Sequence, residues 1–459
     1  MGVGTMDDLL LNSQLAKELY SVAKDLPIID YHNHLSVLDI KENKRYFDIY
    51  ELWIAPDPYK HRAMRMCGVF EDFITGNATN KEKFIKWCET VQKLIGNPLW
   101  HWSYMELSLI FGIDEKINGE NAESLYNRCN LFLAENEITV SSLLDKFNVE
   151  HACPCASLID DISCFFDNTR FAPSLRGDDI FYPTKDFIRK LSDITGFKIN
   201  SIYDYLDAIS KRLHDFKECG CSFSDHALDN GFKFYENDEK NDERFQKLQN
   251  GVLEESEKKR LSSYILEFLG GQYAKLGFTM QLHIGAQRFT STRLRELAGA
   301  AGGFASIGNS VDINSLTIFL DSLEKGKYGL PKTVIFTLNP ADNALISVLS
   351  GSYSKDGVSG LITQGPAWWW CDHKTGITDV LENISVFGVL YNFIGMTTDS
   401  RSFLSFVRHD YFRRILCDWI SKKTENGDFT DDRDSLCELV KNLCYFNAKK
   451  ATGGKYVEI

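Results

Sequence analysis

The feature that most constrains the fold is a recurring unit in which a short apolar segment stops abruptly at polar, chemically capable residues. Eight such segments occur, at Leu26–Ile29, Val149–Ala156, Phe171–Leu175, Cys219–Phe223, Phe278–Leu282, Thr333–Leu338, Val358–Thr363 and Phe393–Met396. Most are separated by stretches long enough for a helix, and 184–217, 312–325 and 376–392 have the apolar spacing of amphipathic helices. Eight strands alternating with helices, each with polar residues at its C-terminal end, predict an α/β fold of the (β/α)8 barrel type.

The alternative fold is an open, doubly wound sheet, which usually has a Gly-rich phosphate loop after its first strand. Here the first segment instead leads into Asp30-Tyr31-His32-Asn33-His34. This difference favours the barrel.

One connection is far longer than an ordinary βα loop, because the second strand begins only at Val149. The interval carries helical patterns at Lys81–Ile95 and Ala122–Glu135. We therefore expect a helical insertion over the barrel mouth. The predicted domains are a metal-dependent barrel of residues 1–34 and 148–459, and an insertion subdomain of residues 35–147.

The composition argues against several classes of protein and indicates the cellular compartment. A net charge of −13 argues against a nucleic-acid-binding enzyme and against a basic membrane-surface protein. The 12 cysteines form no C-x-x-C pair, so they predict reduced thiols rather than a zinc ribbon or a disulfide scaffold. Met1–Asp8 lacks the basic and apolar parts of a secretory signal. With no uninterrupted run of about 18 apolar residues, the chain is expected to be soluble and cytoplasmic.

The strongest local signal for chemistry is the pair His32 and His34. Residues i and i+2 at the end of a strand point to the same side, so both imidazoles can converge on one cation. The first and last strands are neighbours in a closed barrel, which brings Asp399 close to the pair. These three residues are the predicted metal ligands. The alternative for Asp399 is a structural ion pair with Arg401.

Other strand ends offer groups that would line the same mouth. Arg176 has a guanidinium suited to bind a planar carboxylate in a bidentate manner. His283 also follows a strand, where it serves as a ligand or as a core residue. The run Trp368-Trp369-Trp370 offers flat faces for a sugar, or packs as core.

Seven blocks of sequence, in order along nearly the whole chain, resemble the uronate isomerase (glucuronate isomerase) family, a branch of the metal-dependent amidohydrolase superfamily. The blocks are Asp30–Leu35, Tyr59–Arg65, Ser224–Leu228, Gln281–Arg288, Gly365–Asp372, Thr398–Ser402 and Phe412–Leu416. The resemblance implies a distorted TIM barrel with a helical insertion after the first strand.

The resemblance also implies an aldose–ketose isomerase of hexuronate catabolism. Such an enzyme interconverts D-glucuronate with D-fructuronate, and D-galacturonate with D-tagaturonate, by moving a proton from C2 to C1 through a cis-enediol. It implies one divalent ion, with Zn²⁺ expected and Mn²⁺ or another divalent ion as alternatives. The implied partner is a small hexuronate substrate, and no nucleic acid or membrane partner is expected. The oligomeric state is left open, with a homo-oligomer possible.

By analogy with that family, the site residues have distinct roles. His32, His34 and Asp399 surround the metal, and Asp399 also acts as the base. Arg401 binds the hydroxyls at C2 and C3, and Tyr59 binds the C1 carbonyl oxygen. The expected substrate-binding residues are Arg176, His226, His283 and Trp369.

The chain departs from the family at one point, because Pro58 precedes Tyr59 where a His is common.

Two alternative functions also remain open. A metal-dependent hydrolase on the same barrel would often use two ions and a bridging carboxylated Lys, and the fourth candidate strand has no Lys. A sugar-acid-binding protein without activity would have no use for a base at C2.

Overall fold

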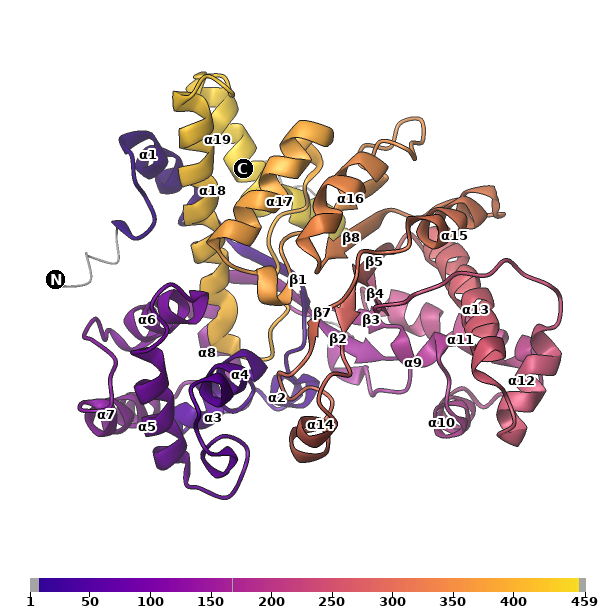
Figure 1. The fold of residues 1–459 in the computed structure, drawn as a ribbon, viewed down its shortest axis with the longest axis horizontal. Coiled ribbons are helices and arrows are strands. Elements are labelled where there is room, and N and C mark those ends of the chain that lie inside the picture. The colour runs from indigo at the N-terminus through magenta and orange to yellow at the C-terminus, as the bar shows by residue number, and fades with distance from the viewer. Residues whose placement is uncertain (1–7, 167, 454–459) are drawn as a thin grey trace.

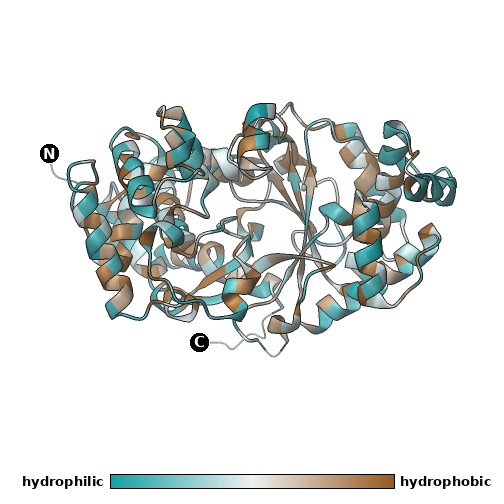
Figure 2. Cartoon of the chain, turned by 90° about the horizontal axis from the view of Figure 1, so that it is seen from below, coloured by the Kyte–Doolittle hydropathy of each residue, from teal (hydrophilic) through white to brown (hydrophobic). Residues whose placement is uncertain are grey.

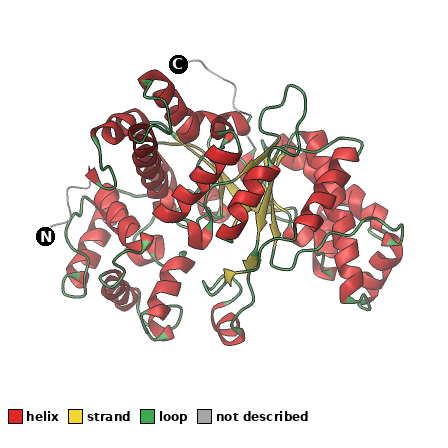
Figure 3. Ribbon diagram, turned by 45° about the horizontal axis from the view of Figure 1, so that its top comes forward, coloured by secondary structure: helices red, strands yellow, loops and turns green. Residues whose placement is uncertain are grey.

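The computed structural model describes residues 8–166 and 168–453, with a parallel sheet of seven strands at its centre (Figures 1 and 3). The strands are β1 (Ile28–Asn33), β2 (Val149–Ser157), β3 (Ser174–Arg176), β4 (Phe223–Leu228), β5 (Thr279–Ile284), β8 (Thr333–Thr337) and β9 (Ile362–Gln364). They pair in the order of the chain, each parallel to the next. This sheet, wound by helices on its outer side, confirms the predicted barrel class and gives it a distorted form.

The eighth predicted strand, Phe393–Met396, is the exception within the described residues, because it has no regular ladder. The segment after it still runs beside β1. The N–H of Asp399 donates to the carbonyl of His32 at 3.1 Å, and the N–H of His34 donates to the carbonyl of Ser400 at 2.8 Å. Positive φ angles at Gly395 (94°) and Asp399 (46°) break the extended conformation that a ladder requires. The segment therefore joins β1 by isolated bonds rather than by a ladder.

Between β1 and β2 the chain is helical, and in Figure 1 these indigo and purple helices gather at one side of the sheet. They are α2 (Val37–Lys41), α3 (Ile49–Trp53), α4 (Pro58–Met66), α5 (Asn80–Val91), α6 (Pro98–Phe111), α7 (Ala122–Glu135) and α8 (Val140–Lys146). A capping box fixes the start of α5, since Thr79 and Glu82 each accept a backbone N–H of the other.

The remaining helices follow their strands and cover the outside of the sheet. They are α9 (Asp178–Phe181), α10 (Lys185–Thr195), α11 (Ile202–Glu218), α12 (Asn241–Asn250), α13 (Glu255–Leu276), α15 (Ile313–Lys325), α16 (Asn343–Leu349), α17 (Lys374–Phe387) and α18 (Val407–Glu425). The predicted helical stretch 184–217 is divided at Gly196, whose φ of 74° ends α10. Helix α1 (Gln14–Ala23) packs on α18, and α19 (Arg433–Lys441) and α20 (Asn447–Ala451) end the described chain. A short hairpin of β6 (Ala286–Gln287) and β7 (Ser306–Ile307) flanks α14 (Thr292–Ala298).

Two apolar layers hold these elements together, and Figure 2 shows the hydrophobic central strands between helices of mixed hydropathy. The large layer lies between the sheet and its helices and continues into the helices after β1. The smaller one fills the barrel interior with Ile29, Tyr31, Cys153, Phe223, Val334, Phe336 and Ile394, and Tyr445 and Ala448 join it from the C-terminal end of the chain. The strand ends that carry polar residues lie above this second layer, so it forms a rigid floor beneath them.

None of the helices in the described part of the chain has both the length and the apolar character needed to cross a bilayer. Most of the N-terminal stretch without a secretory signal, residues 1–7, lies outside the described residues.

Candidate active site

His32, His34 and Asp399 converge at the end of β1, as predicted from the H-x-H spacing for the two histidines and from the neighbouring first and last strands for Asp399. The Nε2 atoms of His32 and His34 lie 3.2 and 3.1 Å from the same oxygen, Asp399 Oδ1. Burial opposes ionisation of Asp399, but the two imidazoles hold the pKa of its carboxyl well below the usual range. The three side chains therefore form one charged cluster.

The position of Asp399 depends on bonds from both sides of the residue. Its left-handed φ of 46° is uncommon for a residue with a side chain and marks a backbone that its neighbours hold in place. Asp30, fully buried in β1, accepts the backbone N–H of Thr398 at 2.7 Å. Trp368 donates its indole N–H to Asp399 Oδ2 at 2.5 Å. One carboxylate oxygen thus faces the imidazoles and the other faces Trp368.

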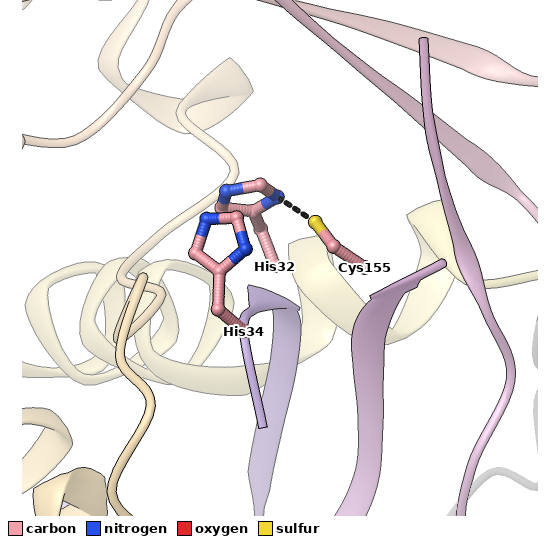
Figure 4. Close-up of side chains that lie close together, drawn as sticks. All are labelled: His32, His34 and Cys155. Carbon is pink, nitrogen blue, oxygen red and sulfur yellow. Dashed lines mark hydrogen bonds between the residues drawn. The ribbon is translucent and has the colours of Figure 1, made fainter. Parts of the chain in front are cut away.

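Three further groups at the strand ends complete the cluster. The sequence indicates His283 as a ligand or a core residue, whereas Asp225 and Cys155 are not among the predicted ligands. Asp225 of β4 lies 2.7 Å from Nδ1 of His283 on β5. Cys155 of β2 has its Sγ 3.6 Å from Nδ1 of His32 (Figure 4). Period-2 alternation along β2 and β4 was the signal that would have placed Cys155 and Asp225 on the inner side.

The donor set fits a divalent cation. Two groups have ligand atoms within 4.8 Å of one another, His32 with His34 and Cys155, and His32 with Asp225 and His283. The Nε2 of His283 is buried without a hydrogen-bond partner in the structure, which is the state of a nitrogen that awaits a ligand. Imidazole, carboxylate and thiolate are all ligands of zinc and related metals.

The histidines and carboxylates of this cluster line a cavity of about 290 Å³ at the barrel mouth. Its floor is formed by the strand ends, and its wall includes Tyr59 from α4 and four residues of the loop before β7, Ala300, Ala301, Gly303 and Ala305. Arg62 ties α4 to this loop by donating to the carbonyls of Gly303 and Ala305. The helices after β1 therefore supply part of the enclosure.

Pro58 has a structural role beside Tyr59. It is the first residue of α4, and Asp57 caps the helix by accepting the N–H of Tyr59 at 2.9 Å. Proline is favoured at this position because its fixed φ suits the helix and its missing N–H would have no helical partner. Pro58 also lines the cavity, where it offers an apolar surface.

Tyr59 is held by aromatic and charged neighbours. Its ring packs edge-on against Trp370, with centroids 5.2 Å apart. The guanidinium of Arg408 lies 4.9 Å from the ring centroid, and Asp372 lies 3.7 Å from Arg408. Burial, with Asp399 adding to it, raises the pKa of the Tyr59 phenol well above its ordinary value. Tyr59 is therefore a neutral donor at neutral pH.

Two arginines give the cavity positive charge opposite the carboxylates. Arg176 at the end of β3 and Arg401 after Asp399 both line it. Burial, together with the nearby charge of Arg176, lowers the pKa of Arg401, and Asp399 opposes this shift. Two like charges held together favour an anionic ligand between them.

Of the remaining predicted residues, His283 and Trp369 line the cavity, whereas His226 does not. His226 follows Asp225 on β4, so it points outward, where its Nε2 lies 2.9 Å from the Tyr273 hydroxyl on α13. Burial lowers the pKa of His226 to about 4. Trp369 has a φ of 46°, and the guanidinium of Arg288 lies 5.0 Å from its ring centroid.

A parallel barrel with imidazoles and carboxylates around one cavity at its strand ends defines a barrel enzyme with a candidate metal centre. Comparison with known proteins specifies the family. The family model described as glucuronate isomerase matches residues 1–451, and the chain belongs to this family.

Individual relatives agree over almost the full length. The chain is 39% identical over 463 residues to a uronate isomerase of Caldicellulosiruptor saccharolyticus, which covers 97% of this chain and 98% of the relative. It is 40% identical over 456 residues to a uronate isomerase of Bacillus licheniformis, with 96% of each chain covered. The crystal structure of a uronate isomerase from Thermotoga maritima superposes with a TM-score of 0.91 at 29% identity, covering 98% of this chain and 100% of that one.

Proposed function

We propose that this protein is a uronate isomerase that interconverts D-glucuronate with D-fructuronate, and D-galacturonate with D-tagaturonate. Membership of the glucuronate isomerase family supports the activity. The observation that carries the assignment of roles is the position of Asp399. Its carboxylate lies against His32 and His34 and lines the same cavity as Tyr59 and Arg401.

The reaction moves a carbonyl from C1 to C2, so one proton leaves C2 and one arrives at C1. On this proposal the Asp399 carboxylate, kept ionised by the adjacent imidazoles, takes the C2 proton and delivers it to C1. Arg401 binds the oxygens at C2 and C3 and stabilises the enediolate charge. Tyr59, neutral and directed at the C1 oxygen, moves the hydroxyl proton from O2 to O1.

Substrate recognition follows from the remaining groups of the cavity. Arg176 binds the C6 carboxylate through its bidentate guanidinium, with His283 beside it. Trp369 offers an aromatic face to the sugar. The outward direction of His226 gives it an indirect part, in which it fixes β4 through Tyr273 and thereby positions Asp225.

One divalent ion, with Zn²⁺ favoured over Mn²⁺, belongs to this proposal, and His32, His34 and Asp399 would hold it. When bound, it would orient the substrate carboxylate and adjacent hydroxyl and polarise their surroundings. A metal-dependent hydrolase is the second candidate, because the group of His32, Asp225 and His283 offers donors from the middle strands. About one ion per chain supports the isomerase, and two support the hydrolase.

The proposal also includes the domain organisation of the chain and its cellular compartment. Residues 1–34 and 148–459 form the catalytic barrel, and residues 35–147 form a subdomain that contributes Tyr59 and closes the mouth. The cysteines are free thiols, which supports a reducing compartment such as the cytoplasm.

The deciding experiment is proton NMR of the zinc-loaded protein with D-glucuronate or D-galacturonate in D₂O. We expect the ketose signals to grow with the wild type and to be absent with Asp399→Asn. Asp321→Asn, a surface substitution on α15, is the matched control and should keep full activity. If the metal is bound and neither uronate yields a ketose, the isomerase proposal fails.

A further inference from the structure

Arg408, the second residue of α18, connects the two residues that move protons in the proposed reaction. Its guanidinium is buried, and its Nη1 donates to the carbonyl of Thr398 at 3.2 Å, directly before Asp399 in the chain. The central carbon of the same group lies 4.9 Å from the ring centroid of Tyr59 and 4.0 Å from that of Trp102. One rigid group therefore touches both the backbone beside Asp399 and the ring of Tyr59.

Ion pairing alone does not account for the position of this guanidinium. Its ion pairs, with Asp372 Oδ2 at 3.7 Å and with Asp57 Oδ2 at 4.0 Å, are longer than the about 2.7–2.9 Å of a charge-assisted hydrogen bond. Among the described residues, its Nε and Nη2 have no hydrogen-bond partner. An arginine placed only to form an ion pair would bring its two-pronged edge onto a carboxylate. Here the shortest of these polar contacts is the bond to the Thr398 carbonyl.

Arg413 shows what a structural arginine looks like on the same helix. It is also buried, and it donates to the carbonyls of Lys24 at 3.3 Å and Pro27 at 2.9 Å, which fastens α18 to the backbone before β1. These three residues do not line the cavity. Helix packing accounts for Arg413, but it does not account for a guanidinium placed over Tyr59.

The backbone of Tyr59 is tied to the same charged group. Asp57 accepts the N–H of Tyr59 through Oδ1 at 2.9 Å. The other oxygen of Asp57 accepts from Lys60 Nζ at 2.8 Å and lies 4.0 Å from Arg408 Nη2. The ring and the backbone of Tyr59 therefore each have a connection to Arg408, which restricts movement of both.

We propose that Arg408 is a positioning residue that sets the place of the Tyr59 ring relative to Asp399. The bond to the Thr398 carbonyl anchors the guanidinium to the segment that carries Asp399, and the cation attracts the electron-rich face of the Tyr59 ring. This inference rests on the proposed isomerase, in which both residues move protons on the same C1–C2 unit. Because one substrate must meet both groups, an error in their spacing slows the reaction even when each side chain is intact.

Substitution of Arg408 should therefore lower kcat more than it changes KM. Arg408 does not line the cavity, so the proposed substrate-binding side chains stay in place. Arg408→Lys keeps the charge but lacks the planar group that bonds Thr398 and lies over the rings. We expect kcat to fall about 10- to 100-fold with KM nearly unchanged. Arg408→Met, which fills a similar volume without charge, should lose at least as much, and Arg413→Lys is the matched control that should keep both constants.

The discriminating measurement combines Arg408→Lys with Tyr59→Phe in the full-length protein at saturating zinc. If Arg408 acts through Tyr59, the double variant should have nearly the kcat of Tyr59→Phe alone, because the hydroxyl that Arg408 positions is already absent. A double variant whose loss equals the product of the two single losses would overturn the proposal. Single Arg408 variants with the kcat of Arg413→Lys would overturn it as well.

Urea denaturation of each variant separates positioning from a purely structural role. We expect the Arg408 and Arg413 variants to remain folded at the assay temperature, with the loss of kcat confined to the Arg408 variants. If both Arg408 variants fail to fold while Arg413→Lys folds, Arg408 is a structural residue and the proposal is overturned. A zinc-loaded wild type that yields no ketose would instead overturn the isomerase itself, a result distinct from an active wild type with insensitive Arg408 variants.

Discussion

Asp30 accepts two hydrogen bonds from Thr398, one from its backbone N–H at 2.7 Å and one from its hydroxyl at 2.8 Å. Asp30 is fully buried in β1, whereas Thr398 belongs to the irregular segment that takes the place of an eighth strand. His409 of α18 reaches the same carboxylate at 3.1 Å. One buried side chain therefore joins the seam of the barrel and fixes the residue that precedes Asp399.

Asp30→Asn should loosen both the fold and the metal centre. The amide keeps the size of the side chain but loses the charge that strengthens these bonds, and its NH₂ group faces donors. We expect a loss of about 1–3 kcal/mol in the free energy of unfolding, as for a buried group left unsatisfied. Zinc affinity should fall about 10- to 100-fold, because Asp399 is held less well. Urea denaturation and zinc titration measure these effects. Asp25→Asn, at an exposed position, is the control, and equal behaviour of the two variants would contradict the anchoring role.

Tyr59→Phe should abolish most of the activity and leave the fold intact. The ring would keep its contacts with Trp370 and Arg408, while the proton-transferring hydroxyl would be lost. A drop in kcat of about 100-fold or more is expected for loss of a general acid–base group. Tyr182→Phe removes a hydroxyl from the same cavity, away from Asp399, and should leave kcat nearly unchanged. Steady-state kinetics with D-glucuronate compares them, and similar kcat values for both variants would contradict the proton-transfer role.

The proximity of His32, His34 and Asp399 could be predicted from the sequence, because the first and last strands of a closed barrel are neighbours. It was less successful with strand ends. The fourth strand was predicted at Cys219–Phe223, yet β4 begins at Phe223 and runs to Leu228, with Asp225 paired to Gln281 of β5. Polar residues were interpreted as the end of a strand, but those that face the mouth of a barrel remain in the ladder.

Other parts of the site needed the exact strand register or contacts between distant residues. Cys155 falls within the predicted apolar run Val149–Ala156, because a cysteine in a strand resembles a small hydrophobic residue until its neighbours are known. His226 was predicted to bind substrate, whereas in β4 it lies on the opposite side from Asp225 and its Nε2 is 2.9 Å from the Tyr273 hydroxyl. The irregular path of residues 393–400 depends on the side chain of Asp30, a contact between distant parts of the sequence.

Asp372 should make stability depend on pH. Burial raises the pKa of Asp372 to about 7, with Arg408 opposing the shift and Asp399 adding to it. The unfolded value is about 3.9, so the folded state holds the proton more tightly. The group therefore favours the folded state most below about pH 4, and this advantage is lost as the pH rises toward 7.

Asp372→Asn keeps the side chain neutral at every pH and should remove that dependence. At about 1.4 kcal/mol per pKa unit, the difference in unfolding free energy between variant and wild type should move by roughly 2–3 kcal/mol in favour of the variant from pH 5 to pH 8. Urea denaturation of both proteins at the two pH values measures it. A difference that stays constant would show that Asp372 ionises normally.

Arg176→Gln should weaken substrate binding more than catalysis. Arg176 lines the cavity at the end of β3, where its Nε forms an ion pair with Asp178 Oδ2 at 3.7 Å. If it binds the C6 carboxylate, which does not change during the reaction, its loss affects ground state and transition state alike. KM should therefore rise about tenfold or more, as expected for loss of a charged hydrogen bond of about 1.5–3 kcal/mol, while kcat changes little.

Arg176→Lys tests the geometry of that contact. Lysine keeps the charge without the planar, bidentate guanidinium, so it should recover only part of the lost affinity. Arg189→Gln, on the exposed face of α10, is the matched control and should leave both constants unchanged. If kcat fell while KM held, Arg176 would act on the transition state. Arg401 would then bind the C6 carboxylate, and the proposed roles of the two arginines would be exchanged. This binding mode would move the reacting C1 and C2 away from Asp399.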